Sequence, residues 1–435
     1  MNHRHSTHLA ATALSCLLAA GSLAAAAPAV AQAKYAFEPS PVLAGSELAA
    51  PALLKGPLHT VAEPVTLDGN FGRFIIESKF GRFVVVGENM LAMRVHELAA
   101  IQALQEVQSS QAFQDALLRS ASAPIQFVQS AFTDPLGTAE NVGQGLGTVL
   151  GRIGFLARST AQTVADSTTA SGPAATASGV PGPATGEQAP SGFMGDPFGY
   201  NKARRDWARQ LNIDPYTTNP VLRPLLDNAA RASFAGSFAV NTTLGAVSMG
   251  ANMVVEFDTT VRDAVWNKPA LDLARDNEAQ LIALGVNPRT TRDFIRNRWF
   301  TPTMQTALAT ALAGIGRVEG VESVIQVASQ LDGETRVRFL VDSIRMLKQF
   351  NEKEGRIVKL RMSNLVPVGV EPDGTLVIAA AIDYAYWDPA AAEFAQRKDL
   401  KGKRRIALVA GQVSRRATQE FEKAGLTLRA GLRAR

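Results

Sequence analysis

Two carboxylates close together near the end of the chain are its strongest candidates for chemistry. Residues 383–388 read Asp-Tyr-Ala-Tyr-Trp-Asp, so Asp383 and Asp388 flank three aromatic rings. Paired carboxylates perform general acid–base chemistry in hydrolases, and aromatic rings stack against sugars. A second interpretation is structural: a strand ends here, and Asp388 caps a helix that begins at Pro389. We favour the structural interpretation and keep a hydrolase as the alternative.

A run of cations follows these carboxylates and predicts affinity for anions. The candidate residues for binding anionic lipid or glycan are Lys401, Lys403, Arg404, Arg405, Arg415 and Arg416. Each cation near an anionic surface contributes on the order of 1 kcal/mol. The alternative is a solvated turn between a helix and a strand. The net charge of the whole chain is only +5, so we do not expect a nucleic-acid partner.

The sequence lacks complete motifs for zinc binding, phosphate binding and serine-hydrolase chemistry. His96-Glu97 would need a second histidine four residues after the first to bind zinc, and Ala100 occupies that position. Gly411, between an expected strand and an expected helix, is a single glycine without the lysine of a phosphate-binding loop. No Gly-x-Ser-x-Gly sequence occurs. We therefore expect neither a metal nor a cofactor.

The first 33 residues have the pattern of a cleaved secretory signal peptide. Arg4 precedes an apolar, alanine-rich stretch over residues 9–27, and two small-x-small sites follow at residues 29–31 and 31–33. An uncleaved anchor or a lipoprotein signal is the alternative, but no lipobox precedes Cys16. Cleavage would remove Cys16, the only cysteine, so the mature chain could form no disulfide. We expect an exported protein of the periplasm or outer envelope.

The N-terminal part of the mature chain predicts a small β-plus-helix domain. Residues 34–60 are rich in Pro and Ala and suggest an extended arm before a domain over residues 61–158. The tetrapeptide Phe-Gly-Arg-Phe occurs at residues 71–74 and again at 80–83, which predicts a hairpin that packs on the next helix, residues 88–108. A binding surface formed by Arg73 and Arg82 is the alternative. A further helix is expected near residues 112–122.

Three glycines at a spacing of four residues carry the most specific packing signal. Gly143, Gly147 and Gly151 would form a smooth groove on a helix, where another helix or a lipid chain could approach closely. Packing on the protein's own core, an interfacial helix and a loop all fit this pattern. Residues 159–196 follow, and their Ser, Thr, Ala, Gly and Pro composition predicts a flexible linker.

A helical domain is expected over residues 197–355. Asn219-Pro220 marks one helix start, and six more helices are expected at residues 260–266, 271–284, 290–299, 304–315, 321–331 and 334–351. Residues 232–255 carry no charge and are long enough to cross a bilayer. They contain five Asn, Ser and Thr residues between 241 and 252, so we favour buried core helices over a membrane span.

A short similarity to a known family lies in this helical part. Residues 241–245, Asn-Thr-Thr-Leu-Gly, resemble a stretch of the outer-membrane lipoproteins of the phospholipid-retrieval pathway, and the Asp-Pro-aromatic triplets at 196–198 and 214–216 are similar in character. The chain lacks the acylated cysteine of that family, and we assign no family on these few residues.

The C-terminal residues 356–435 predict a small α/β module. Strands are expected at residues 357–362, 366–370, 376–384, 406–410 and 426–428, with helices at 389–396 and from Ser414 to 424. The predicted fold class is therefore α+β and mainly α-helical. The function we expect is an envelope-associated, non-enzymatic structural or interaction protein, attached peripherally to membrane or to a partner protein. A periplasmic hydrolase using Asp383 and Asp388 is the alternative.

Overall fold

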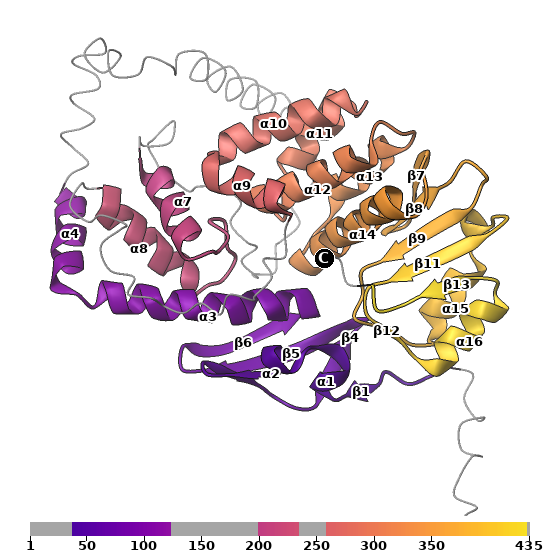
Figure 1. Cartoon of the computed structure of the whole chain (residues 1–435), viewed down its shortest axis with the longest axis horizontal. Coiled ribbons are helices and arrows are strands. Elements are labelled where there is room, and N and C mark those ends of the chain that lie inside the picture. The colour runs from indigo at the N-terminus through magenta and orange to yellow at the C-terminus, as the bar shows by residue number, and fades with distance from the viewer. Residues whose placement is uncertain (1–36, 123–198, 235–257, 433–435) are drawn as a thin grey trace, which may run out of the picture.

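The computed structural model describes residues 37–122, 199–234 and 258–432. Within these ranges the protein is α+β and mainly α-helical, as predicted. Figure 1 shows an N-terminal sheet covered by one long helix, a layer of helices above it, and a second sheet at the C-terminal end. The expected signal peptide, the glycine series at 143–151, the linker and residues 235–257 lie outside the described ranges.

The N-terminal sheet is antiparallel and starts earlier in the chain than the sequence indicated. Its strand order is β1-β4-β5-β3-β2, with β6 paired to the other edge of β5. The strands are β1 (Val42–Leu43), β2 (Lys55–Gly56), β3 (His59–Val61), β4 (Val65–Asp68), β5 (Phe71–Ser78) and β6 (Gly81–Val86). Two short helices, α1 (Gly45–Leu48) and α2 (Pro51–Leu54), lie between β1 and β2. The expectation of an extended arm is therefore wrong for residues 42–60, because Leu43, Leu48 and Val61 are buried in the same core as the sheet.

The hairpin β5–β6 packs on helix α3 (Glu88–Gln108), as the repeated tetrapeptide predicted. Alternate residues of both strands, among them Phe74 and Phe83, point to the face where Leu91 and Leu98 of the helix are buried. Each such side chain contributes about 1.5–3 kcal/mol by leaving water. Arg73 and Arg82 do not lie opposite one another: Arg73 faces Val86 across the hairpin, whereas Arg82 faces Glu77 and forms an exposed ion pair with it at 3.1 Å.

Helices from both sides of the expected linker share this first core. They are α4 (Gln111–Ser122), α7 (Tyr200–Gln210) and α8 (Leu222–Phe234). Trp207, Leu211 and Leu226 are fully buried with Leu104 and Phe113 of the N-terminal part. The hydrophobic cores thus do not follow the expected boundaries at residues 158 and 197. The predicted boundaries rested on local composition, which does not show that segments distant in the chain pack into one core.

A second core lies between the helical layer and the C-terminal sheet. Its helices are α9 (Thr259–Asn267), α10 (Ala270–Ala283), α11 (Pro288–Ile295), α12 (Pro302–Ile315), α13 (Val321–Gln330) and α14 (Glu334–Lys353), which confirms the six helices expected there. Helix α12 is buried along nearly its whole length and packs on α14 through Leu308, Leu312, Leu340 and Ile344. Helix α14 then covers one face of the sheet (Figure 1).

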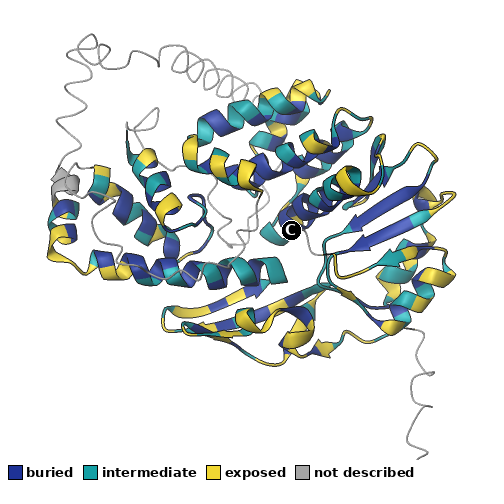
Figure 2. Cartoon of the chain, in the orientation of Figure 1, coloured by how far each residue is buried: buried dark blue, intermediate teal, exposed yellow. Residues whose placement is uncertain are grey.

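The C-terminal sheet has strand order β13-β11-β9-β8-β7, with β9, β11 and β13 parallel. Its strands are β7 (Lys359–Ser363), β8 (Val366–Val370), β9 (Leu376–Ala380), β11 (Arg405–Val409) and β13 (Thr427–Arg429). Helices α15 (Pro389–Gln396) and α16 (Arg415–Lys423) cover the face opposite α14, and β10 (Tyr384–Ala385) pairs with β12 (Gln412–Val413). Figure 2 shows β9 and β11 as buried, as expected for parallel strands with helices on both faces. The predicted α/β module is confirmed.

No helix within the described ranges combines the length and the apolar composition that a bilayer crossing requires. Of the uncharged stretch at 232–255, only the first three residues lie within those ranges.

Gly320 provides a test of how the helical layer joins the sheet. It precedes α13 with φ +91°, and a Cβ atom there would overlap the backbone oxygen of Leu360 on β7. We expect Gly320→Ala to lower the free energy of unfolding by about 3 kcal/mol or more, because the overlap is with backbone atoms and a flexible side chain cannot relieve it by turning away. The matched control is Gly333→Ala, which has φ +105° and no atom within 4 Å of its Cβ position. It should cost only about 1–2 kcal/mol. Equal losses in urea unfolding would contradict the prediction.

Candidate functional site

Asp383 binds backbone groups of the N-terminal sheet and of helix α3. Its carboxylate accepts hydrogen bonds from the backbone N–H of Gly72 at 2.8 Å and of Glu88 at 3.0 and 3.2 Å. Glu88 is the first residue of α3, and its N-cap Gly87 has no side chain to supply that acceptor. Asp383 therefore caps a helix 295 residues earlier in the chain, where the positive end of the helix dipole stabilises a carboxylate.

Asp388 caps helix α15, as predicted. Its carboxylate accepts the backbone N–H of Ala391 at 2.7 Å, and Pro389 occupies the first helical position. A third carboxylate, Glu38, lies in the same region and accepts the N–H of Trp387 at 2.6 Å and the hydroxyl of Ser414 at 2.7 Å. Asp383 thus attaches the C-terminal module to the N-terminal sheet, and Glu38 attaches it to the segment before β1, whereas the hydrogen bond of Asp388 lies within the module.

The six cations of the candidate anion site do not form one cluster. Lys401, Lys403 and Arg404 are exposed in a loop, the 401–404 loop, that immediately precedes β11. Arg415 and Arg416 begin α16, after the opposite end of that strand. A strand advances about 3.3 Å per residue, so the five residues of β11 separate the two groups by about 16 Å. The structure brings the first three cations together and places the last two elsewhere.

Arg405 is half-buried and already engaged, because its guanidinium donates a hydrogen bond to the carbonyl oxygen of Ala424 at the end of α16. Lys401, Lys403 and Arg404 form no hydrogen bond or ion pair through their side chains with the described residues. Two carboxylates of the β8–β9 turn lie within electrostatic range of this loop. Burial and Asp373 raise the pKa of Glu371, and Arg404 opposes this increase.

A buried polar cluster surrounds Glu97, which the sequence indicated only through an incomplete zinc motif. This cluster joins α3 to residues 214–219, which lie between α7 and α8 and which we call the 214–219 loop. Glu97 is 1 % exposed, and its carboxylate pairs with Arg94 at 2.8 Å. The same carboxylate accepts hydrogen bonds from the hydroxyl of Thr217 and from the side-chain amide of Asn219, the latter at 2.8 Å. Both oxygens of this buried anion therefore accept hydrogen bonds, three in all, which offset its desolvation.

The cluster continues from the 214–219 loop to helix α14. Arg94 donates to the hydroxyl of Thr218 at 2.6 Å, and Thr218 donates to Glu334 at 2.9 Å. Arg338 pairs with Glu334 at 3.2 Å. Burial by itself would raise the pKa of Glu334, but Arg338, Arg94 and the Thr218 hydroxyl outweigh it, and the pKa lies below its usual range. Helices α3 and α14 are thus connected through alternating charges.

Asp214 is the first residue of the 214–219 loop. Unlike Glu97, it is stabilised by hydrogen bonds and not by an ion pair within the described residues. Its carboxylate accepts the hydroxyl of Thr303 on α12 at 2.7 Å and the backbone N–H of Tyr216 at 2.8 Å. Burial raises its pKa above the usual value, the two hydrogen bonds oppose this, and the nearby Glu97 carboxylate raises it further. The loop consequently contacts α3, α12 and α14 through successive side chains.

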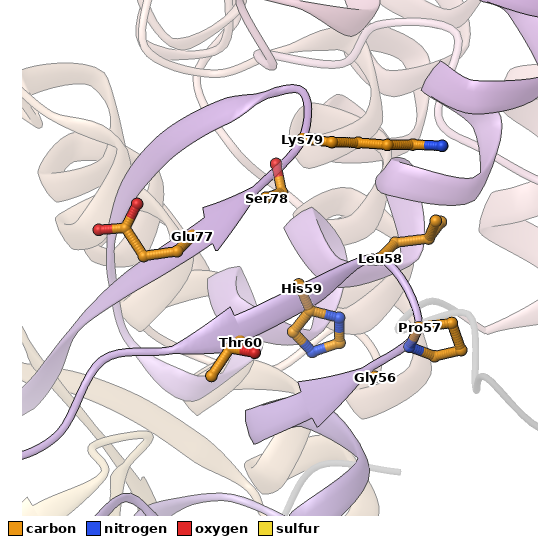
Figure 3. Close-up of a pocket in the computed structure, with 8 residues that line it drawn as sticks. All are labelled: Gly56, Pro57, Leu58, His59, Thr60, Glu77, Ser78 and Lys79. Carbon is orange, nitrogen blue, oxygen red and sulfur yellow. The ribbon is translucent and has the colours of Figure 1, made fainter.

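A shallow hollow of about 390 Å³ lies between the β2–β3 hairpin and the β5–β6 turn (Figure 3). His59 is buried beside it, and its Nε2 lies 3.0 Å from the carbonyl oxygen of Leu53. Burial lowers the pKa of His59. Glu77 at the rim is paired with Arg82, and Lys79 lies over the ring of Phe80 at 5.0 Å. These side chains have partners, so we do not assign a ligand to the hollow.

Within residues 37–122, 199–234 and 258–432, no group of three or more His, Cys, Asp or Glu side chains is arranged to bind a metal ion.

No protein-family model, curated protein or solved structure matches this chain.

Removal of the Glu97 charge tests whether the polar cluster stabilises the fold. We expect Glu97→Ala to lower the free energy of unfolding by about 3–5 kcal/mol, because Arg94 is left buried without its counter-ion. Glu106→Ala on the exposed face of the same helix is the control and should change stability by less than about 1 kcal/mol. Urea unfolding monitored by circular dichroism measures both. A loss at Glu97 as small as that of the control would refute the structural role.

The raised pKa of Asp214 predicts a specific pH dependence. A group with a raised pKa stabilises the fold fully below its unfolded pKa, which is 3.8, and loses that contribution as pH rises through its folded pKa. Asp214→Asn keeps an oxygen to accept both hydrogen bonds and removes the titration. The variant should therefore gain stability relative to the native chain as pH rises from about 4, and the difference should become constant above the folded pKa. Unfolding measured from pH 4 to 8 provides the test, and a difference independent of pH would contradict it.

Proposed function

We propose that this protein is an exported, non-enzymatic component of the cell envelope that attaches peripherally to an anionic surface through its C-terminal module. The observation that carries the proposal is the 401–404 loop. Lys401, Lys403 and Arg404 project from one loop, and all three are exposed. They have no hydrogen-bond or ion-pair partner among the described residues, so their charges are available to an external anion.

The magnitude of this attraction suits reversible attachment. Three cations at about 1 kcal/mol each contribute about 3 kcal/mol, or roughly a hundredfold in affinity. Asp373 and Glu371 in the adjacent turn reduce the net positive potential. Binding should therefore weaken steeply with salt, because the charges are exposed and the Debye length is only about 8 Å at physiological ionic strength.

The contacts of Asp383 and Asp388 favour this proposal over a hydrolase. A general acid or a nucleophile needs an oxygen that can reach a substrate. The Asp383 carboxylate is directed at the backbone N–H groups of Gly72 and Glu88, and that of Asp388 at Ala391. These bonds support a role for both residues in joining and capping elements of the fold. The signal-peptide pattern of the first 33 residues supports export.

Vesicle binding tests the 401–404 loop. We expect the triple variant Lys401→Gln, Lys403→Gln, Arg404→Gln to bind vesicles containing phosphatidylglycerol about 10- to 100-fold more weakly than the native protein at low salt. Arg415→Gln is the matched control: this cation is also exposed, but it lies beyond the other end of β11, and its loss should change binding by less than about threefold. Co-sedimentation at several salt concentrations measures the effect. Equal weakening by both variants, or none by the triple variant, would refute the proposal.

A further inference from the structure

The first turns of helix α7 contain two arginines that are buried on the inner face of the helix. Arg204 is 7 % exposed and Arg205 is 6 % exposed. They share this face with Asn201, which is 3 % exposed, and with Ala208, which is fully buried. Positions 201, 205 and 208 follow the spacing of one helical face, so the face that packs into the core carries guanidinium groups in its N-terminal half.

Arg205 lacks the partners that a buried cation normally has. Its side chain makes no hydrogen bond or ion pair with the described residues, and its Nη1 atom is buried without a hydrogen-bond acceptor. A buried charge without a counter-ion carries a large desolvation cost, so arginines in such positions are paired with carboxylates or with bound anions. Among the residues that the structure describes, Arg205 therefore has no counter-ion.

The described carboxylate on the neighbouring helix α8 does not pair with Arg205. Asp227 is shared by two other residues: Arg204 lies 3.4 Å from it, and the hydroxyl of Tyr200 donates to it at 3.1 Å. Burial and Asp227 raise the pKa of Tyr200 to about 12, so the hydroxyl stays protonated at neutral pH. Arg231 also lies within electrostatic range of Tyr200.

Long side chains on a helix lean toward its N-terminus, so we expect the guanidinium groups of Arg204 and Arg205 to lie toward the turn that begins at Tyr200. The effect of Arg204 on the pKa of Tyr200 agrees with this direction. The N-terminus of α7, an 11-residue helix, adds the positive end of its dipole at the same place.

We infer that the N-terminal end of α7 binds a phosphate group through Arg205, with Arg204 and Arg231 as neighbouring cations. Three guanidinium groups and one carboxylate leave two positive charges, which match a phosphate dianion better than a single carboxylate. The planar guanidinium fork suits bidentate bonds to phosphate oxygens. The group can belong to free phosphate or to the headgroup of a lipid. This site is separate from the 401–404 loop and does not depend on the function proposed for that loop.

Thermal unfolding of the full-length mature protein tests the inference, with inorganic phosphate as the probe and sodium chloride at equal ionic strength as the reference. We expect phosphate at about ten times its Kd to raise the Tm of the native protein by about 2–4 °C. Arg205→Met should abolish this increase, whereas Lys202→Gln should keep it, because Lys202 is exposed and pairs with Asp206 on the same helix. An equal response in Arg205→Met would overturn the inference.

Phosphate-free buffer supplies an independent readout. There we expect Arg205→Met to unfold at a higher temperature than the native protein, because methionine fills a similar volume without an unpaired charge. A lower Tm would mean that Arg205 already has a partner within the chain, and it would overturn the inference. Arg231→Gln at the exposed rim should fold normally and weaken phosphate binding about two- to fivefold in calorimetry. An unchanged affinity would count against the site.

A short-chain phosphatidylglycerol, used below its micelle concentration, distinguishes the two sources of the phosphate group. A Tm increase with inorganic phosphate alone assigns the site to a free phosphate, and an increase with the lipid that is also lost in Arg205→Met assigns it to a headgroup. The triple variant of the 401–404 loop should respond as the native protein does in both arms. Failure of both probes to raise the Tm would overturn the inference.

Discussion

The buried ion pair between Arg94 and Glu97 is the interaction on which the arrangement of the helices depends. Both side chains are nearly inaccessible to water, so each requires the other together with the donors and acceptors of the 214–219 loop. The pair holds the loop through three of its side chains, because Glu97 accepts hydrogen bonds from Thr217 and Asn219 and Arg94 donates to Thr218. The loop then continues to α14 through Glu334, so one desolvated charge on α3 determines the position of a helix more than two hundred residues later.

A second constraint of the same type holds the C-terminal module to the N-terminal sheet. Helix α3 follows a glycine that cannot cap it, and the missing acceptor comes from Asp383, which follows β9. Asn70 strengthens the contact, because its backbone oxygen accepts the N–H groups of Asp383 and Tyr384 and its side-chain amide donates to the carbonyl of Tyr384. Helix α3 is thus fixed by the C-terminal module at its first residue and by the 214–219 loop along its middle. The N-terminal sheet and helix α14 also meet through the edge-to-face rings of Phe71 and Phe339, whose centroids are 6.2 Å apart.

Local patterns in the sequence predicted the elements well and their association poorly. The strand at 366–370 and the helices at 88–108 and 389–396 have the predicted bounds, because periodicity, caps and turns act within a few residues. Ser414 caps α16 as expected. The role of Glu97 could not be predicted in this way, since its partners lie 120 and 122 residues away. The same limit applies to residues 42–60, whose short strands belong to the sheet through their partners: β1 pairs with β4, β3 with β5, and β2 with β3.

The charged residues show most clearly what cannot be predicted from the sequence, because the sequence does not distinguish an exposed lysine from a buried arginine. The run from 401 to 416 stood out by density, yet the structure divides it between the two ends of β11 and engages Arg405 with Ala424. Arg204 and Arg205 are two adjacent basic residues in the sequence. Because both are buried, their charges carry a larger desolvation cost than those of the exposed 401–404 loop. An exposed cation contributes to binding only when an anion is near, whereas a buried one carries its desolvation cost at all times. The strength of a cationic site in this protein is therefore determined less by the number of cations than by how completely the fold removes them from water.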